Sequence, residues 1–420
     1  MKSRWITAAI ISCMALGSFA QSPKDTLDPH KYARITTERP DGRYVSSRGV
    51  VHAMLKRTVP EYTFRPDFSK EQFEQWQQGV SRAMAEVMRH PPMDNLPAPC
   101  RVDSRQKDGY RVEKWESYPL PETVVPFLVL IPDEVNKSKP APAVMCIPGS
   151  GETKETAAGQ PELHPRFQED EPLERWIIAL PYVRQGLVAV VVDNPGAGEA
   201  SDLERHTIAP DYQYEAVARY LLELNWSYLG YSSFCDLHIL NWMKQQDFIN
   251  KERILVSGFS LGTEPLMVMG ALDRSIYGFI FNDFLCRTLE RAIVLTEPNK
   301  YGVRPFPNSI RHLIPGFWCK FDFPDIVASF APRPIIFTEG GLDRDLNLVS
   351  RAYEIAGKKE NASIFFYPKY SNPADRQMLD RLPEGIDRKT YFNLVNVDDP
   401  MHDIKTNLTI PWLVKVLGLK

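Results

Sequence analysis

A serine flanked by two glycines follows an apolar segment in the second half of the chain. The sequence GFSLG, Gly258 to Gly262, comes directly after RILVS, Arg253 to Ser257. A G-x-S-x-G pattern carries little information alone, but a strand before it and a helix after it are the setting of the nucleophile elbow. RILVS is typical of a buried strand and Leu261–Leu272 of a helix. The sequence therefore predicts that Ser260 is the nucleophile of an acyl transfer, at a helix N-terminus that favours developing negative charge.

A serine hydroxyl is a poor nucleophile unless a neighbouring base takes its proton. In chains with this elbow, the order along the sequence is serine, acid, histidine. Two histidines follow Ser260, namely His312 and His402. His312 lies inside an irregular segment, whereas His402 lies in VNVDDPMHDIK, just before the last expected helix. The order and position favour His402 as the base.

The acid is expected on a loop after a late strand, where it would accept a hydrogen bond from the imidazole and fix its tautomer. IIFTEGGLD places Asp343 there, behind two glycines that let the chain turn. Asp283, at the end of the preceding strand, and Asp345 are the alternatives, in that order. The other interpretation of Asp343 is the N-cap of the helix that follows it.

An oxyanion needs two positioned N–H donors. One is expected from Leu261, immediately after the nucleophile. The other is expected from Ser150 in the loop that follows MCIP, with Gly149 or Gly151 as alternatives. No cofactor is expected, and no metal, because the cysteines and histidines lack metal-binding spacings.

Buried apolar strands alternate with helices along the chain, which predicts a parallel sheet with helices on both faces and chemistry at the carboxyl ends of the strands. The expected strands are TVVPFLVLIP, PAVMCIP, LVAVVVD, RILVS, YGFIFND, RPIIF and SIFFYP, and VDSRQKDGYRVEKWESY is expected to be a hairpin that turns at Asp108-Gly109. A helix is expected from Ser69, with Gln72 completing a capping box. A longer helical region, Tyr214–Phe248, is expected to break near Gly230.

The N-terminus has the order of features of a secretory signal peptide. Lys2 and Arg4 precede an apolar run, Ile6–Leu16, that is too short to span a bilayer, and small residues surround a cleavage position after Ala20. We therefore expect a signal peptide at 1–20, an extension at 21–100 packed on the main domain, a catalytic domain at 101–420, and a secreted or periplasmic protein without a membrane span. The net charge of −3 and pI of about 6.3 argue against a nucleic-acid partner.

Five cysteines remain after the expected cleavage. Export permits disulfides, but the sequence does not determine any pairing. The five residues are Cys100, Cys146, Cys235, Cys286 and Cys319.

The chain resembles α/β-hydrolases of the acetylxylan esterase and cephalosporin-C deacetylase type, and more broadly dienelactone-hydrolase-like enzymes. The segments that carry this resemblance are RILVSGFSLGTEPLMVMGALD, YGFIFNDFLC, DNPGAGEAS, FCDLHILNWMKQQDFINKERI and APRPIIFTEGGLD. The resemblance implies an exported carbohydrate esterase that removes acetyl or methyl groups from plant-type polysaccharides or oligosaccharides. A serine peptidase of the same fold and a catalytically inactive carbohydrate-binding relative are the alternatives.

The chain departs from the family pattern at three places. Pro148-Gly149 stands where many members have His-Gly, and an insertion separates SIFFYP from His402. Leu261 stands where glucuronoyl esterases carry an arginine, which argues against that subgroup.

Two irregular stretches, Asp283–Phe323 and Lys369–Asp399, are expected to shape a substrate site, because long loops at the active end of a sheet usually do so. The alternative is that they cover an edge of the sheet or hold a dimer. The first contains Arg287, which we expect to contact a sugar or a carboxylate. A salt bridge from Arg287 to Asp283 or Glu290 is the alternative. The sequence leaves the oligomeric state open. Other polar and aromatic residues of this stretch are Arg291, Arg304, Phe317 and Trp318.

Overall fold

The computed structural model describes residues 35–37, 39–163, 174–201, 210–295 and 313–419. The predicted signal peptide lies outside these ranges, as do Arg304 and His312. The five cysteines named above are free thiols in the structure. Among the described residues, no helix combines the length and the apolar character needed to cross a membrane.

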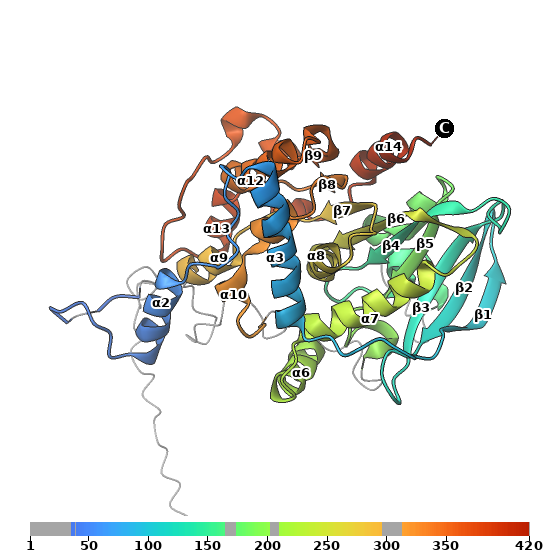
Figure 1. Ribbon diagram of the computed structural model, residues 1–420, viewed down its shortest axis with the longest axis horizontal. Helices are drawn as coiled ribbons and strands as arrows, with labels where there is room; N and C mark the ends of the chain where they lie inside the picture. Colours follow the sequence, from blue (N-terminus) through green and yellow to red (C-terminus); the bar gives the residue numbers. More distant parts are fainter. Residues whose placement is uncertain (1–34, 38, 164–173, 202–209, 296–312, 420) are drawn as a thin grey trace, which may run out of the picture.

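A nine-stranded sheet lies at the centre of the molecule, in the order β1-β2-β3-β5-β4-β6-β7-β8-β9 (Figure 1). The strands β4 to β9 run parallel to one another, whereas β1, β2 and β3 pair antiparallel and β3 joins β5 antiparallel. This confirms the predicted α/β-hydrolase class. The strands are β1 Cys100–Gln106, β2 Tyr110–Ser117, β3 Val125–Pro132, β4 Ala141–Ile147, β5 Val188–Val192, β6 Ile249–Phe259, β7 Gly278–Asn282, β8 Ile335–Phe337 and β9 Ala362–Ile364.

The central strands β4 and β5 are apolar along their whole length, as expected where both faces of a sheet are covered. Successive residues of β4 alternate between two separate hydrophobic clusters, with Met145 in one and Cys146 in the other. Both side chains are fully buried. The sheet is therefore the middle of three layers, as the runs of apolar residues predicted.

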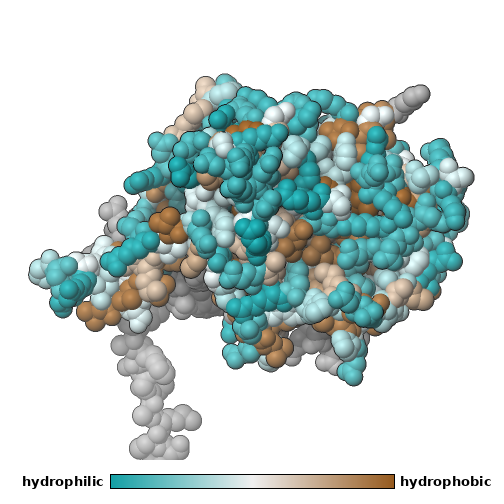
Figure 2. All heavy atoms as spheres, in the orientation of Figure 1, coloured by the Kyte–Doolittle hydropathy of each residue, from teal (hydrophilic) through white to brown (hydrophobic). Residues whose placement is uncertain are grey.

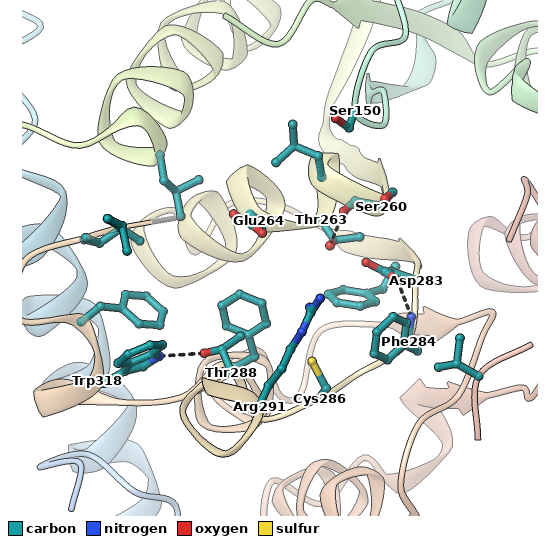
Figure 3. A pocket seen from close by; sticks show the side chains of 18 of the residues that line it. Ser150, Ser260, Thr263, Glu264, Asp283, Phe284, Cys286, Thr288, Arg291 and Trp318 are labelled. Atoms are coloured by element: carbon teal, nitrogen blue, oxygen red, sulfur yellow. Dashed lines mark hydrogen bonds between the residues drawn. The ribbon is translucent and has the colours of Figure 1, made fainter. Parts of the chain in front are cut away.

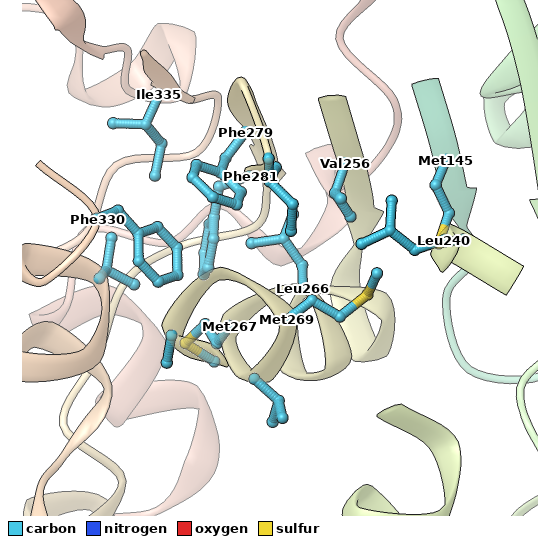
Figure 4. Packing of buried hydrophobic residues seen from close by; sticks show 14 of the residues in the cluster. Met145, Leu240, Val256, Leu266, Met267, Met269, Phe279, Phe281, Phe330 and Ile335 are labelled. Carbon is cyan, nitrogen blue, oxygen red and sulfur yellow. The ribbon is translucent and has the colours of Figure 1, made fainter. Parts of the chain in front are cut away.

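Helices cover both faces of the sheet. Figure 4 shows α8 packed against the sheet, with Leu266 and Met269 in the same hydrophobic cluster as Val256 of β6 and Phe279 of β7. The helices on this face are α3 Lys70–Met88, α7 Tyr228–Met243, α8 Thr263–Leu272, α11 Phe323–Ala328 and α12 Asp343–Ile355. Those on the other face are α4 Lys154–Ala158, α5 Ala179–Val183 and α14 Thr406–Leu417.

The N-terminal extension is part of this packing. Ser69 and Gln72 form the predicted capping box at the start of α3, and α3 lies beside α8 (Figure 1). A shorter helix, α2 Ser47–Arg57, projects from the main body and exposes hydrophobic side chains (Figure 2), among them Val51 and Met54.

The long helical region breaks earlier than predicted. The helix α6, Pro210–Glu223, ends before Asn225, and Ser227 caps the start of α7, so Gly230 lies in the first turn of the second helix. Ser227 accepts a hydrogen bond from the Gly230 N–H, and this cap sets the boundary. In their described residues, the two irregular stretches contain the further helices α9 Thr288–Val294, α10 Phe317–Lys320 and α13 Arg388–Leu394.

Candidate active site

Ser260 sits on a sharp turn between β6 and α8. Its φ of +49° lies in the left-handed region that L-residues rarely adopt, as a nucleophile elbow requires. The flanking glycines are required by space, because a Cβ on Gly258 would lie 2.3 Å from the Gly262 oxygen and one on Gly262 would lie 2.2 Å from the Ile147 oxygen. The predicted elbow geometry is therefore present, with Ser260 opening the short 3₁₀ turn Ser260–Gly262 that leads into α8.

His402 lies close to this turn. It follows the 3₁₀ turn Asp399–Met401 and precedes α14, and its ring stacks on Phe259 with ring centroids 4.7 Å apart. His402 and Ser260 line the same cavity. The structure thus brings the predicted base next to the residue that precedes the predicted nucleophile.

The carboxylate that meets His402 is Glu339. Its Oε2 lies 2.7 Å from His402 Nδ1. Tyr367 Oη donates to the same oxygen at 2.6 Å, and Lys405 Nζ donates to Oε1 at 3.0 Å. Burial alone would raise the pKa of Glu339, but the hydrogen bond from His402 and the charges of His402 and Lys405 bring it below its usual value. Glu339 is therefore a buried, fixed anion that orients the imidazole.

The structure does not bring Asp343 to His402, which corrects the predicted position of the acid. Gly340 and Gly341, with φ of +66° and +135°, turn the chain directly after Glu339. Asp343 then begins α12, where its Oδ2 lies 3.4 Å from Arg376 Nε. The signal for Glu339 was in the sequence, because it stands two residues beyond β8, at the carboxyl end where functional side chains gather.

Asp283, the second-ranked acid, also faces His402. It follows β7, and its carboxylate, that of Glu339 and the His402 ring present atoms that lie within 4.8 Å of one another. The pKa of Asp283 is raised to about 7, and burial of the carboxyl group is the main cause. Burial would lower the pKa of His402, but the hydrogen bond to Glu339 and the negative charge of Asp283 outweigh it and raise the pKa to about 9. Two carboxyl groups therefore act electrostatically on one imidazole.

The same three side chains offer donor atoms that a cation would accept. Both oxygens of Glu339 already accept hydrogen bonds, however, and the Lys405 ammonium occupies the position beside Oε1. A metal ion would have to displace this positive charge and break the contact with His402. The donor set fits an oriented histidine better than a metal centre.

The loop after β4 presents one amide to the cavity. The N–H of Gly149 donates to Glu152 Oε2 at 3.0 Å and that of Gly151 to Tyr214 Oη at 2.9 Å. For the N–H of Ser150 the described residues supply no acceptor. Leu261 is the second residue of a 3₁₀ turn, so its N–H has no partner within the turn. Ser150, Leu261 and Ser260 all line the cavity.

Asn194 holds the loop after β4 in this orientation. Its Nδ2 donates to the Pro148 oxygen at 2.8 Å and to the Gly149 oxygen at 3.2 Å. The C=O and N–H groups of a trans peptide point in opposite directions. Because Gly149 C=O points at Asn194, the Ser150 N–H of the same peptide points away from Asn194. The DNPGAGEAS segment therefore contributes Asn194, which holds the loop after β4 in place.

The cavity has a volume of about 760 Å³ (Figure 3). Phe317 and Trp318 of the first irregular stretch line it, together with Arg291. Arg287 does not line it, because its Nε lies 2.6 Å from Asp345 Oδ1 in an ion pair. Arg287 thus forms a salt bridge, as in the alternative interpretation, but with Asp345, a partner that the sequence did not suggest. Asp345, the third-ranked acid, is buried in that pair.

Comparisons with known proteins agree with this architecture. The model of the Abhydrolase family matches residues 26–415. A protein from Bacteroides fragilis NCTC 9343, described as a "putative acetyl xylan esterase", is 56% identical; the match covers 92% of this chain and 99% of that one, with a TM-score of 0.87. The methylesterase BT1017 is 17% identical over 88% of this chain and 68% of that one, with a TM-score of 0.53, which supports the fold alone. Among curated proteins no sequence matches the chain.

Proposed function

Because the chain belongs to the Abhydrolase family, we propose that it is an exported serine esterase that removes acetyl or methyl groups from polysaccharides or oligosaccharides. The observation that carries the proposal is the 2.7 Å contact between His402 Nδ1 and Glu339, with Ser260 on its elbow in the same cavity. The 56% identical relative supports a carbohydrate ester as substrate. The signal-like N-terminal sequence supports export.

The proposed reaction divides the roles among three side chains. Ser260 Oγ attacks the ester carbonyl carbon while His402 Nε2 accepts its proton. Glu339 fixes the tautomer through Nδ1 and stabilises the imidazolium that forms. His402 then gives the proton to the leaving oxygen, which is a sugar hydroxyl for an acetyl ester and methanol for a methyl ester. A water molecule, deprotonated by His402, hydrolyses the acyl-enzyme.

The negative charge of the tetrahedral intermediate needs donors that are already in place. The N–H groups of Leu261 and Ser150 are the two candidates, since each lines the cavity and neither has an acceptor among the described residues. One such donor contributes about 10²–10³-fold to turnover in serine hydrolases.

The decisive test is active-site titration. We expect a fluorophosphonate to label the protein once per chain, at Ser260, and the Ser260→Ala variant to lose both labelling and aryl acetate hydrolysis while its circular dichroism spectrum stays unchanged. Released acetate and methanol, measured on acetylated xylan and methylated pectin, then identify the ester. Turnover retained in Ser260→Ala, or cleavage of peptides in place of esters, would contradict the proposal.

A further inference from the structure

We propose that Arg291 forms an anion subsite in the cavity, so that the natural substrate carries a carboxylate or sulfate group on the sugars beside the scissile ester. This inference rests on the proposed function and names the class of substrate that the site would prefer. It starts from a comparison of Arg291 with three other arginines of this region.

The arginines near Arg291 have carboxylate partners. Arg287 pairs with Asp345, Arg344 pairs with Glu290, and Arg376 lies beside Asp343. Arg291 differs from all three in one respect, because no carboxylate among the described residues pairs with it. Its buried Nε has no hydrogen-bond acceptor there, which is also true of the Nε atoms of Arg344 and Arg376, and its guanidinium lies 5.6 Å from the Tyr391 ring centroid.

The carboxylates of the cavity wall do not pair with Arg291. Glu264, Asp283 and Asp399 line the same cavity, but none of them forms an ion pair with Arg291 among the described residues. The free thiol of Cys286 also lines the cavity. A guanidinium that is partly removed from water without an opposite charge is costly. An oxyanion that enters the cavity would offset this cost, because the planar fork of an arginine matches carboxylate and sulfate groups with two parallel hydrogen bonds.

The position of Arg291 suits a group close to the reacting ester. Figure 3 shows the side chain running from α9 into the cavity, toward the part where Asp283 and Ser260 lie. The cavity volume of about 760 Å³ exceeds the need of an acetyl group and is in the range of sites that hold a whole small ligand. The sugar that bears the ester, or its neighbour, can therefore place an anion at Arg291.

The test compares matched esters that differ only in charge. The substrates are an acetylated neutral oligosaccharide, the same backbone with a hexuronate, and the same backbone with a sulfate ester. We expect the wild-type protein to favour an anionic substrate in kcat/KM by at least tenfold. In Arg291→Met this preference should fall by about 10–100-fold, the value of a charge-assisted hydrogen bond, and Arg291→Lys should retain part of it.

The matched control is Arg82→Met, which removes an exposed arginine on α3, away from the cavity. This variant should keep the wild-type preference. A preference for the hexuronate substrate identifies a carboxylate as the anion, and a preference for the sulfated one identifies a sulfate. Equal kcat/KM for all three substrates, or an unchanged preference in Arg291→Met, would overturn the inference.

Binding separates this inference from the proposed function. Calorimetry with a hexuronate-containing oligosaccharide on Ser260→Ala needs no turnover. We expect at least tenfold weaker binding when Arg291→Met is added to that variant. If the wild-type protein hydrolyses no ester, the proposed function falls while this binding result still decides on Arg291; if esters are hydrolysed and binding ignores Arg291, only the subsite falls.

Discussion

At the scale of single residues, the contact between His402 and Glu339 should decide turnover. Replacing Glu339 with glutamine keeps the shape but removes the charge that fixes the imidazole tautomer. We expect kcat for an aryl acetate to fall by about 10²–10⁴-fold, as for other triads that lose their acid. Steady-state kinetics at saturating substrate measure this directly.

The matched control for that experiment is Asp343→Asn. Asp343 is the carboxylate that the sequence favoured, and in the structure it faces Arg376 at the start of α12. Its replacement should change kcat less than about threefold, because Asp343 contacts neither His402 nor the cavity that holds Ser260. If Asp343→Asn lowered kcat severely and Glu339→Gln lowered it only slightly, Asp343 would be the acid of the triad, as the sequence predicted.

Asp283 should contribute to the pH dependence of the reaction, after the hydrogen bond between His402 and Glu339. Only neutral His402 can accept a proton, so kcat/KM should be lost as pH falls through its pKa of about 9. The negative charge of Asp283 raises this pKa, and Asp283→Asn should therefore lower it and extend activity toward neutral pH. A pH profile of kcat/KM tests the sign: a midpoint that stays fixed or moves to higher pH would show that Asp283 does not act on His402.

At the scale of elements, the loop after β5 should position the loop after β4. Asn194→Ala releases the oxygens of Pro148 and Gly149, so the Ser150 N–H is no longer held toward the cavity. We expect kcat to fall by up to about 10²–10³-fold, the contribution of one oxyanion donor, with little change in KM. A loss confined to KM would indicate a role in substrate binding alone.

The control for Asn194 lies on the same loop. Ser201 Oγ donates to the Gly198 oxygen at 2.6 Å, and among the described residues Ser201 makes no hydrogen bond to the loop after β4. Ser201→Ala should lose some stability and keep kcat. If kcat falls equally in both variants, general disorder of the loop explains the effect. The hypothesis that Asn194 specifically positions the loop after β4 would then be wrong.

The elements could be predicted from the sequence to a large extent, because strand periodicity, the elbow glycines and the capping box of α3 are local signals. The acid could not be chosen in the same way. Gly340 and Gly341 indicated a turn, but the sequence does not say on which side of a turn the functional carboxylate stands. Arg287 is the N-cap residue of α9 and Arg291 lies one helical turn further on. Only the fold shows which of them faces Asp345 and which faces the cavity.

At the scale of the whole molecule, the N-terminal extension is joined to the catalytic core. Phe73, Val80 and Met84 of α3 belong to the same hydrophobic cluster as the sheet. Gln77 Nε2 adds buried hydrogen bonds to the oxygens of Ser329 and Ala331, at 2.7 and 2.6 Å. The extension therefore contributes to the same core as the strands that carry the site.

This predicts that a cavity in α3 destabilises the entire protein. Met84 is fully buried, and Met84→Ala removes contacts without adding a polar group, so we expect a loss of about 2–5 kcal/mol. Urea unfolding, followed by both tryptophan fluorescence and loss of esterase activity, measures the change. Gln78→Ala, exposed on the same helix, is the control and should leave the midpoint in place. Because one core links α3 to the sheet, the two signals should shift together; activity that survives to the wild-type midpoint while fluorescence shifts would show that the extension unfolds independently.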